Sequence, residues 1–396
     1  MKQSKITSAI NRTFGMNASM GAMLVMVVLL GMGEKMGERF LPVYLLALGS
    51  SAYAVGLLNA LDNFLSAIYA LLGGYISDRI GYKRALKVYT WVSIGGYATI
   101  VLFPFWQAVF LGAILFISWT ALSLPAILSL VSATVKKEKQ VMGVSLHSMM
   151  RRVPMALGPI AGGLLIAQFG IVSGARMAFG IALILGFVAL WFIDKNVVDH
   201  HDASNSREPL RIRETYGRMS SSLKTLLVSD ILIRFAEQIP YAFVVVWVIE
   251  KLGFSAITFS FLTAIEMVVA LLIYIPVALL SEKVSNKGLV TITFGFFAIF
   301  PLILAFSTTL PMLIFAFVIR GLKEFGEPTR KAMIMKLAPE GAKATTYGTY
   351  YLLRDVVVAI ASLSSAYLWQ VSPSLNFFVA AGFGILGTLL FATKMK

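Results

Sequence analysis

Ionisable side chains interrupt three of the long apolar stretches of this chain. Glu34, Lys35 and Glu38 lie in the first stretch, and Glu237 lies in a later one. The most polar stretch carries Arg320, Lys323, Glu324, Glu327, Arg330 and Lys331. An ionisable residue near the centre of a bilayer costs at least ~2.5 kcal/mol, so each of these side chains must face water or the protein interior. Residues of this kind can take up protons or bind a polar solute.

Four carboxylates are candidates for proton coupling: Glu34, Glu237, Glu324 and Glu327. Glu34 leads, because Lys35 can pair with Glu38 within one helix and would leave Glu34 without a local counter-ion. A structural ion pair between Glu34 and another helix is an equal alternative. The candidates for contact with a solute are Glu38, Trp119, Tyr241, Arg320 and Lys323.

The charges of the most polar stretch recur four residues apart, a spacing that allows ion pairs within one helix. The spacing predicts pairs of Arg320 with Glu324, Lys323 with Glu327, and Glu327 with Lys331. The alternative is that such pairs serve only to keep a polar helix inserted in the bilayer.

The composition places these side chains in membrane helices. Of 396 residues, 58% are hydrophobic and 13% are charged, and the mean hydropathy is +0.82. A spanning helix needs roughly 20 apolar residues, and the chain accommodates about twelve such helices. The predicted spans are residues 18–47, 52–76, 85–105, 108–134, 141–169, 174–193, 225–249, 256–280, 288–307, 311–337, 344–369 and 374–393. We therefore expect an all-α membrane protein.

Basic residues mark one side of this protein. The net charge is +15, and the cations fall in the terminal segments and in alternate loops, as the positive-inside rule expects of cytoplasmic segments. The pattern argues against nucleic acid as a partner. It places both termini in the cytoplasm. The shortness of the loops fits a bacterial-type inner membrane protein.

Several other chemistries lack their residues. The chain has no cysteine, which excludes disulfides and cysteine-based metal sites. It has no Gly-x-x-x-x-Gly-Lys-Ser/Thr segment to bind ATP and no nucleophile with a matching base, so we expect neither an enzyme nor a cofactor. Adjacent His200 and His201 lie in a polar connector, where neighbouring residues rarely form a closed metal site.

One short loop carries a denser pattern. Gly74, Asp78, Arg79, Gly81, Lys83 and Arg84 follow the spacing Gly-x-x-x-Asp-Arg-x-Gly-x-Lys-Arg. This loop resembles the signature loop between helices 2 and 3 of the major facilitator superfamily of secondary transporters. The resemblance implies the major facilitator fold, two six-helix halves, alternating access and a cavity lined by helices 1, 4, 7 and 10. It also implies that Asp78 helps to close the cytoplasmic side.

The second half of the chain repeats the first. A shift of about 204 residues places Leu48-Gly49 over Leu252-Gly253 and Asp62 over Glu266, and at a similar shift Arg151-Arg152 falls over Arg354-Asp355. The repeat predicts six-helix halves at residues 1–193 and 225–396, joined by a cytoplasmic linker at residues 194–224. In the family's fold helix 2 packs on helix 11 and helix 5 on helix 8. We therefore expect two gating ion pairs: Asp62 with Arg354, and Glu266 with Arg151 or Arg152.

A segment of the fifth span favours one direction of transport. Gly158, Pro159, Gly162 and Gly163 resemble the core of a motif found in the superfamily's proton-coupled antiporters, although Pro154 replaces a glycine of that motif. This resemblance favours efflux of a small organic compound in exchange for protons, by a monomer in the lipid bilayer. The alternatives are proton-coupled uptake of a polar or anionic solute and, less favoured, a transporter-like membrane sensor.

Overall fold

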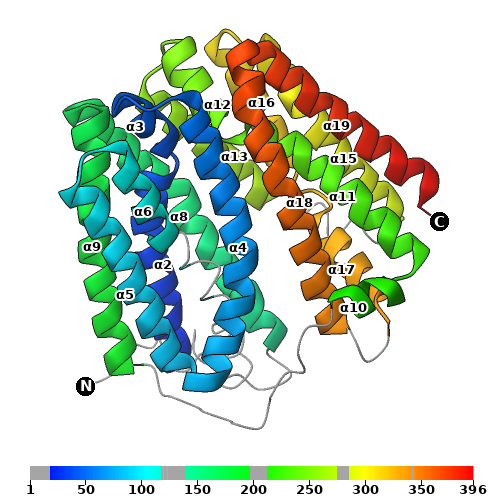
Figure 1. Cartoon of the computed structure of the whole chain (residues 1–396), viewed down its shortest axis with the longest axis horizontal. Helices are drawn as coiled ribbons and strands as arrows, with labels where there is room; N and C mark the ends of the chain where they lie inside the picture. Colours follow the sequence, from blue (N-terminus) through cyan, green and yellow to red (C-terminus); the bar gives the residue numbers. More distant parts are fainter. Residues whose placement is uncertain are drawn as a thin grey trace. The chain divides into compact units, whose positions relative to one another are not determined.

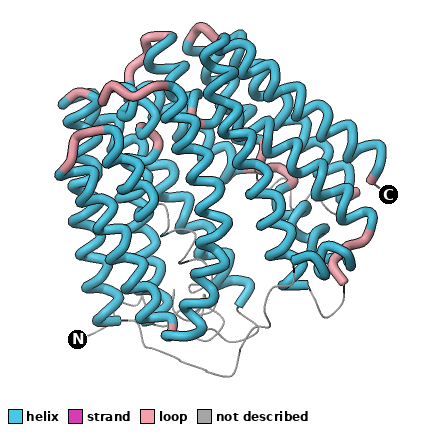
Figure 2. The backbone as a smooth tube through the Cα atoms, in the orientation of Figure 1, coloured by secondary structure: helices cyan, strands magenta, loops and turns pink. Residues whose placement is uncertain are grey.

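Every regular element in the described part of the chain is a helix (Figures 1 and 2). The computed structural model describes residues 18–116, 119, 123, 140–196, 212–273, 285–339 and 343–395. Within these ranges no strand occurs. The expectation of an all-α protein is therefore confirmed. The linker histidines His200 and His201 lie outside the described residues.

The described residues pack as two compact units. The first unit draws on residues 1–44 and 65–207, and the second on residues 45–64 and 208–396. Residues 45–64 lie early in the sequence, yet they pack with the second unit. The division of the sequence at residues 193 and 224 remains a prediction.

The first unit is built around one central helix. Helix α2 packs against α8 and α9, and α5 packs against α6 and α9. Between α5, α6 and α9, the rings of Tyr97, Phe116 and Phe179 lie with centroids 5.5–6.1 Å apart in the core. The helices of this unit are α2 (Ala18–Glu38), α5 (Tyr82–Leu102), α6 (Trp106–Phe116), α8 (Gln140–Phe169) and α9 (Ile171–Asn196), and the chain crosses between the units within α3 (Leu41–Ala47) and α4 (Ala52–Ile80).

The second unit groups its helices around α11. Helices α11, α15 and α19 lie side by side, and α18 also packs on α11 (Figure 1). Ser220, Ser285 and Ser372 accept hydrogen bonds from backbone N–H groups in the first turns of α11, α15 and α19, so each helix starts at a capping serine. The helices are α10 (Ile212–Arg218), α11 (Ser221–Tyr241), α12 (Phe243–Val246), the π-helical turn η2 (Trp247–Lys251), α13 (Ala256–Leu272), α15 (Asn286–Phe306), α16 (Leu310–Leu322), α17 (Glu327–Leu337), α18 (Lys343–Val371) and α19 (Pro373–Lys394).

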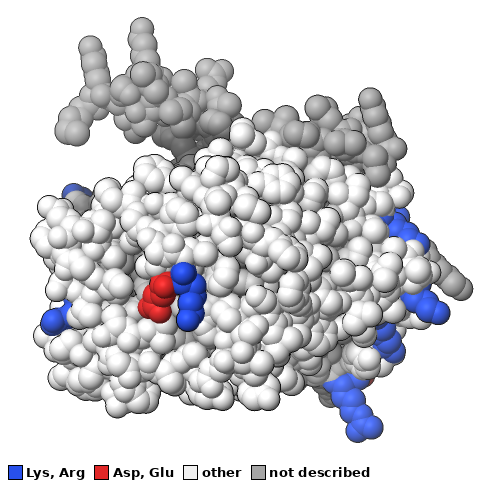
Figure 3. Space-filling model, turned by 90° about the horizontal axis from the view of Figure 1, so that it is seen from above, with Lys and Arg blue, Asp and Glu red and all other residues white. Residues whose placement is uncertain are grey.

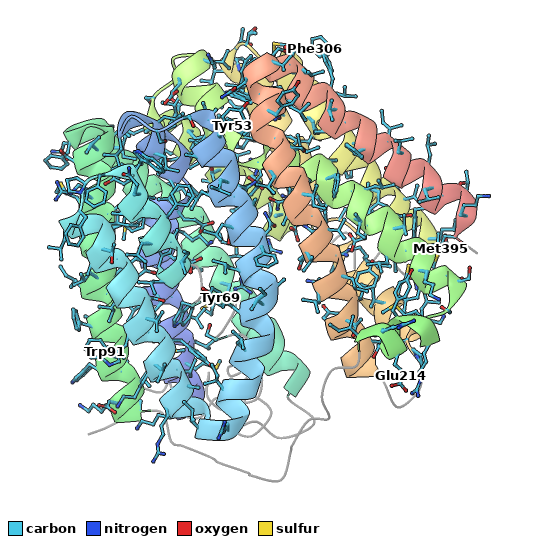
Figure 4. The ribbon with its side chains drawn as sticks, viewed as in Figure 1. Tyr53, Tyr69, Trp91, Glu214, Phe306 and Met395 are labelled. Atoms are coloured by element: carbon cyan, nitrogen blue, oxygen red, sulfur yellow. The ribbon has the colours of Figure 1, made fainter. Side chains whose placement is uncertain are left out.

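Each of the twelve predicted spans overlaps a helix in the described residues. Seven helical segments of the described part are long and apolar enough to cross a membrane. They are residues 83–102, 150–169, 171–196, 221–251, 286–306, 346–371 and 373–394. Large apolar side chains on the outer surface, such as Trp91 at 54% and Phe306 at 63% exposure, suit contact with lipid (Figure 4). On the face drawn in Figure 3, uncharged residues, drawn in white, cover most of the surface of the described residues.

Two predicted spans are wrong as continuous helices. Residues 18–47 divide into α2 and α3, and residues 311–337 divide into α16 and α17. Proline lacks the N–H that bonds to the carbonyl four residues earlier, and its ring clashes there. Pro42 and Pro328 stand at the start of α3 and α17, where this missing donor does no harm.

Glycines of α8 bring that helix into close contact with α2 in the first unit. A Cβ on Gly158 would lie 2.7 Å from Lys35 Cβ, and one on Gly162 would overlap the carbonyl oxygen of Met36. Gly180 of α9 has no atom within 4 Å of an added Cβ. The predicted packing segment of α8 thus contacts the helix that carries Glu34.

We expect Gly162→Ala to lower the free energy of unfolding by about 1–3 kcal/mol, because α8 must move away from the α2 backbone. The matched control is Gly180→Ala, which should be neutral or stabilising by up to about 1 kcal/mol, since alanine favours a helix over glycine. Thermal unfolding of both variants in detergent measures the difference. Equal midpoints for the two variants would contradict the close contact.

Candidate functional site

Three charged residues follow one face of α11 in the second unit. Asp230, Arg234 and Glu237 are spaced by four and then three residues, so their side chains line up along the helix. Their signs alternate along that line: negative, positive, negative. A partner helix with the opposite alternation can neutralise all three.

The paired helices α16 and α17 supply that opposite alternation. Arg330 of α17 donates to Asp230, Arg234 lies 3.8 Å from Glu327 Oε1, and the Lys323 ammonium lies 2.7 Å from Glu237 Oε1. The order along α16 and α17 is reversed relative to α11, so the segments pair in antiparallel fashion. We call these three cross-helix pairs the charge ladder.

The end of the charge ladder at Asp230 is deeply buried. Asp230 and Arg330 are each 1% exposed. Arg330 also donates to both carboxylate oxygens of Glu327, at 2.7 and 3.0 Å, and the Tyr350 hydroxyl donates to Asp230 at 3.0 Å. A buried charge of this kind is tolerated only when charged and hydrogen-bonding groups surround it. This end of the ladder therefore has a structural role.

The other end of the charge ladder adds a fourth carboxylate, Glu266 of α13. Arg320 Nε lies 3.2 Å from Glu266 Oε1, and Lys323 Nζ lies 3.5 Å from the same oxygen. Arg234 also donates to Glu237, next to the bond from Lys323. Glu237 therefore holds two cations.

A cavity opens at this second end. About 280 Å³ of its space, open solvent included, is not filled by atoms. Its wall comes from α11, α12, α15 and α16, and it consists of Glu237, Tyr241, Val244, Phe296, Phe297, Phe300, Arg320 and Lys323. Ligand sites combine an apolar wall with a few polar groups in this way.

The structure brings together several of the predicted site residues. Glu237, Tyr241, Arg320 and Lys323 share the cavity wall, and Glu327 lies one rung along the charge ladder. The predicted pair of Glu327 with Lys331 is confirmed at 3.4 Å. The predicted pair of Lys323 with Glu327 is wrong, because the chain turns at residues 323–326 and Lys323 points to Glu237 and Glu266 instead.

Sequence reasoning missed Asp230, Arg234 and the three phenylalanines of α15. The spacing of Asp230, Arg234 and Glu237 was readable as one helix face, and that signal could have found the ladder. Nothing in the sequence identified which of the many phenylalanines would face the cavity.

The first unit holds the other predicted carboxylates. Lys35 donates to Glu38, as the spacing predicts, but its ammonium also lies 2.9 Å from Glu34 Oε1. Glu34 is 5% exposed. The expectation that Glu34 lacks a local counter-ion is therefore wrong, because one lysine serves both carboxylates. Trp119 is buried and donates to Thr90 Oγ1 at 3.2 Å.

The signature loop forms a tight turn between α4 and α5. Gly81 has φ of +84°, a conformation that glycine adopts without strain. Lys83 donates to the carbonyl oxygen of Asp194 at 2.7 Å, and Lys87 pairs with the Asp194 carboxylate at 2.8 Å. Arg79 and Arg84 are exposed. Gly74 and Asp78 have helical backbone, and their side chains lie outside the described residues.

The predicted gating residue Arg354 lies near the buried end of the charge ladder. It donates to Asp355 at 2.7 Å, lies 3.5 Å from Asp230, and stacks over the ring of Tyr351 at 4.2 Å. The two gating pairs, Asp62 with Arg354 and Glu266 with Arg151 or Arg152, remain predictions.

A network of amide and hydroxyl groups joins the first residues of α4 to the rest of the second unit. Asn59 and Asn63 each donate to Ser362 Oγ of α18, at 3.2 and 3.1 Å. Asn59 also donates to the backbone oxygen of Gln238 on α11, and Asn63 to its side-chain oxygen, both at 3.2 Å. Gln238 follows Glu237 directly, so this network lies next to the cavity acid in the sequence.

Comparison with known proteins supports the same architecture. The family model described as Major Facilitator Superfamily matches residues 14–236 and 226–395. A curated relative from Methanocaldococcus jannaschii, described as an uncharacterised MFS-type transporter, is 24% identical over 375 residues. That match covers 91% of this chain and 90% of the relative.

Two solved structures share the fold. The nucleoside transporter NupG superposes with a TM-score of 0.81 at 12% sequence identity, and the match covers 96% of this chain and 100% of the NupG chain. A POT family transporter in complex with a thioalcohol-conjugated peptide gives 0.79 at 14% identity, covering 95% of this chain and 96% of that one. At these identities the likeness concerns the fold alone.

Proposed function

The chain belongs to the Major Facilitator Superfamily, and we propose that it moves a small organic compound across the membrane in a proton-coupled cycle of alternating access. The observation that carries the proposal is the position of Glu237. This carboxylate lines the cavity and accepts hydrogen bonds from Lys323 and Arg234. A group that touches both the cavity and the charge ladder can link a bound solute to a proton.

Protonation of Glu237 would change the charge of the cavity wall. The neutral acid no longer attracts Lys323 or Arg234, so one net positive charge appears beside the space for the solute. Lys323 keeps Glu266 at 3.5 Å and Arg234 keeps Glu327 at 3.8 Å, so neither cation loses all compensation. The change is therefore large enough to alter affinity without exposing a lone buried charge.

The first direction that we propose is efflux in exchange for protons, by a monomer whose termini face the cytoplasm. The contact of Gly158 and Gly162 with α2 supports it, because the segment that resembles the antiporter motif packs on the helix of Glu34. A second candidate is proton-coupled uptake of a polar or anionic solute into the cell. Two cations in the cavity wall, Arg320 and Lys323, favour this candidate.

Proteoliposomes loaded with the pH dye pyranine test the proposed function. A panel of organic cations, anions and neutral compounds is added outside, and solute-induced proton movement is recorded against protein-free liposomes. Exchange should move protons opposite to the solute, and cotransport should move them in the same direction. Solute uptake that moves no proton would contradict the coupling and leave a passive carrier.

A further inference from the structure

The cavity wall consists of two kinds of side chain. Four rings, those of Tyr241, Phe296, Phe297 and Phe300, form its apolar part. Arg320 and Lys323 supply two cations, against the single carboxylate of Glu237. A solute that satisfies both kinds of wall needs an apolar, ring-like body and a charged group.

The cations of the wall lie directly against its rings. The guanidinium carbon of Arg320 is 5.2 Å from the Phe300 centroid and 5.8 Å from that of Tyr241. The Lys323 ammonium is 5.7 Å from the Phe297 centroid. A guanidinium is weakly hydrated and can hold a carboxylate or sulfonate with two hydrogen bonds, even beside aromatic rings. An aromatic anion would meet its ring partners and its charge partners in one place.

Both acids of the site are already bound by cations of the protein. Glu237 already accepts from Lys323 and Arg234, and Glu266 is 1% exposed and bound by Arg320. An organic cation would have to displace two protein cations from Glu237. An anion requires only that one of these cations turn away from its carboxylate.

The charged groups around Glu237 determine when one of these cations can move away from its carboxylate. They are Arg234 on α11, Arg320 on α16, Lys323 and Glu324 in the turn after α16, Glu266 on α13 and Glu327 on α17, and the phenol of Tyr241 lies at the end of α11. When Glu237 takes a proton, Lys323 loses its 2.7 Å partner and keeps the weaker contact with Glu266 at 3.5 Å, while the charge of Glu324 still acts on it. Proton binding therefore makes Lys323 available to an anion.

We propose that the cavity binds a small aromatic anion, one ring bearing a carboxylate or sulfonate, with Arg320 and Lys323 on the anionic group and the α15 phenylalanines on the ring. The proposal rests on the proposed function for the link between proton binding and anion binding.

Three permanently charged probes separate the contribution of the aromatic ring to binding from that of the negative charge. Benzenesulfonate has the ring and the negative charge, methanesulfonate has the charge alone, and benzyltrimethylammonium has the ring with a positive charge. Isothermal titration calorimetry of the purified protein in detergent, at pH 5.5 and at pH 8, measures the affinity of the protein for each probe. We expect benzenesulfonate to bind at least about tenfold more tightly than either other probe, a difference of about 1.4 kcal/mol, and more tightly at pH 5.5.

Variants assign the binding to this cavity. Lys323→Gln should weaken the binding of benzenesulfonate at least about tenfold. Lys336 is an exposed lysine of α17, so Lys336→Gln should leave this binding unchanged. Phe296→Leu keeps every charge of the cavity wall and should weaken the binding of benzenesulfonate but not that of methanesulfonate. This variant therefore tests the site even if Lys323→Gln fails to fold. Equal affinity for benzyltrimethylammonium, absence of benzenesulfonate binding, or an unaffected Lys323→Gln variant would each overturn the proposal.

The two levels of proposal fail differently. If benzenesulfonate binds as expected but no compound moves protons in the pyranine assay, the proton-coupled function fails and the anion site stands. If organic cations drive proton movement while benzenesulfonate does not bind, the transport function stands and the anion site fails.

Discussion

Replacing Arg330 by Met is expected to lower the free energy of unfolding by about 3–5 kcal/mol, because it leaves Asp230 as a buried charge without its principal partner. Arg330 fills a fully buried position among Asp230, Glu327 and the Tyr351 hydroxyl, which lies 3.5 Å from it. Methionine keeps much of the volume and removes every hydrogen bond. The unfolding midpoint in detergent should fall sharply.

The matched control for this variant is Lys336→Met on the same helix, where the side chain is exposed. A surface change of this kind should alter stability by no more than about 0.5 kcal/mol. A double variant with Asp230→Asn and Arg330→Met removes both charges and should recover part of the loss. Equal stability of Arg330→Met and Lys336→Met would show that the buried pair does not stabilise the fold.

Glu237→Gln is expected to abolish accumulation of solute driven by a pH gradient while preserving exchange of solute for solute. The glutamine has nearly the same shape and can still accept a hydrogen bond from Lys323, but it cannot bind and release a proton. Both activities are measured in proteoliposomes, with and without the imposed gradient, using a compound selected in the pyranine assay.

Two further variants locate the proton site. Glu250 is an exposed residue of η2. The variant Glu250→Gln should therefore accumulate and exchange solute like the unsubstituted protein. Glu34→Gln removes the leading candidate of the sequence analysis, a carboxylate that shares Lys35 with Glu38. Loss of gradient-driven accumulation in Glu34→Gln but not in Glu237→Gln would move the proton site to the first unit.

The helices and the family could be predicted from the sequence because both depend on local patterns. Apolar stretches report a spanning helix wherever it lies in the fold, and the loop from Gly74 to Arg84 carries its pattern within a few residues. The turn at Gly81 follows from the same locality, since only its own φ is concerned.

The candidate site was only partly predictable because its contacts join distant segments. Charges four residues apart suggest pairs within a helix, but the chain turns at residues 323–326, just before Pro328 at the start of α17. Lys323 then bonds to Glu237, 86 positions away in sequence. Which acid a lysine reaches depends on how two helices are rotated against each other, and the packing of the whole unit decides that rotation.

The reversed order of the charge ladder also has a consequence for how the chain is made. Along its ladder face, helix α11 carries Asp230, Arg234 and Glu237, so this face has one more negative charge than positive charges. The compensating Lys323 and Arg330 follow about 90 residues later, which corresponds to roughly 5–20 s of synthesis. During that interval the ladder face of α11 has none of its partners from α16, α17 and the turn between them, because those segments are not yet made.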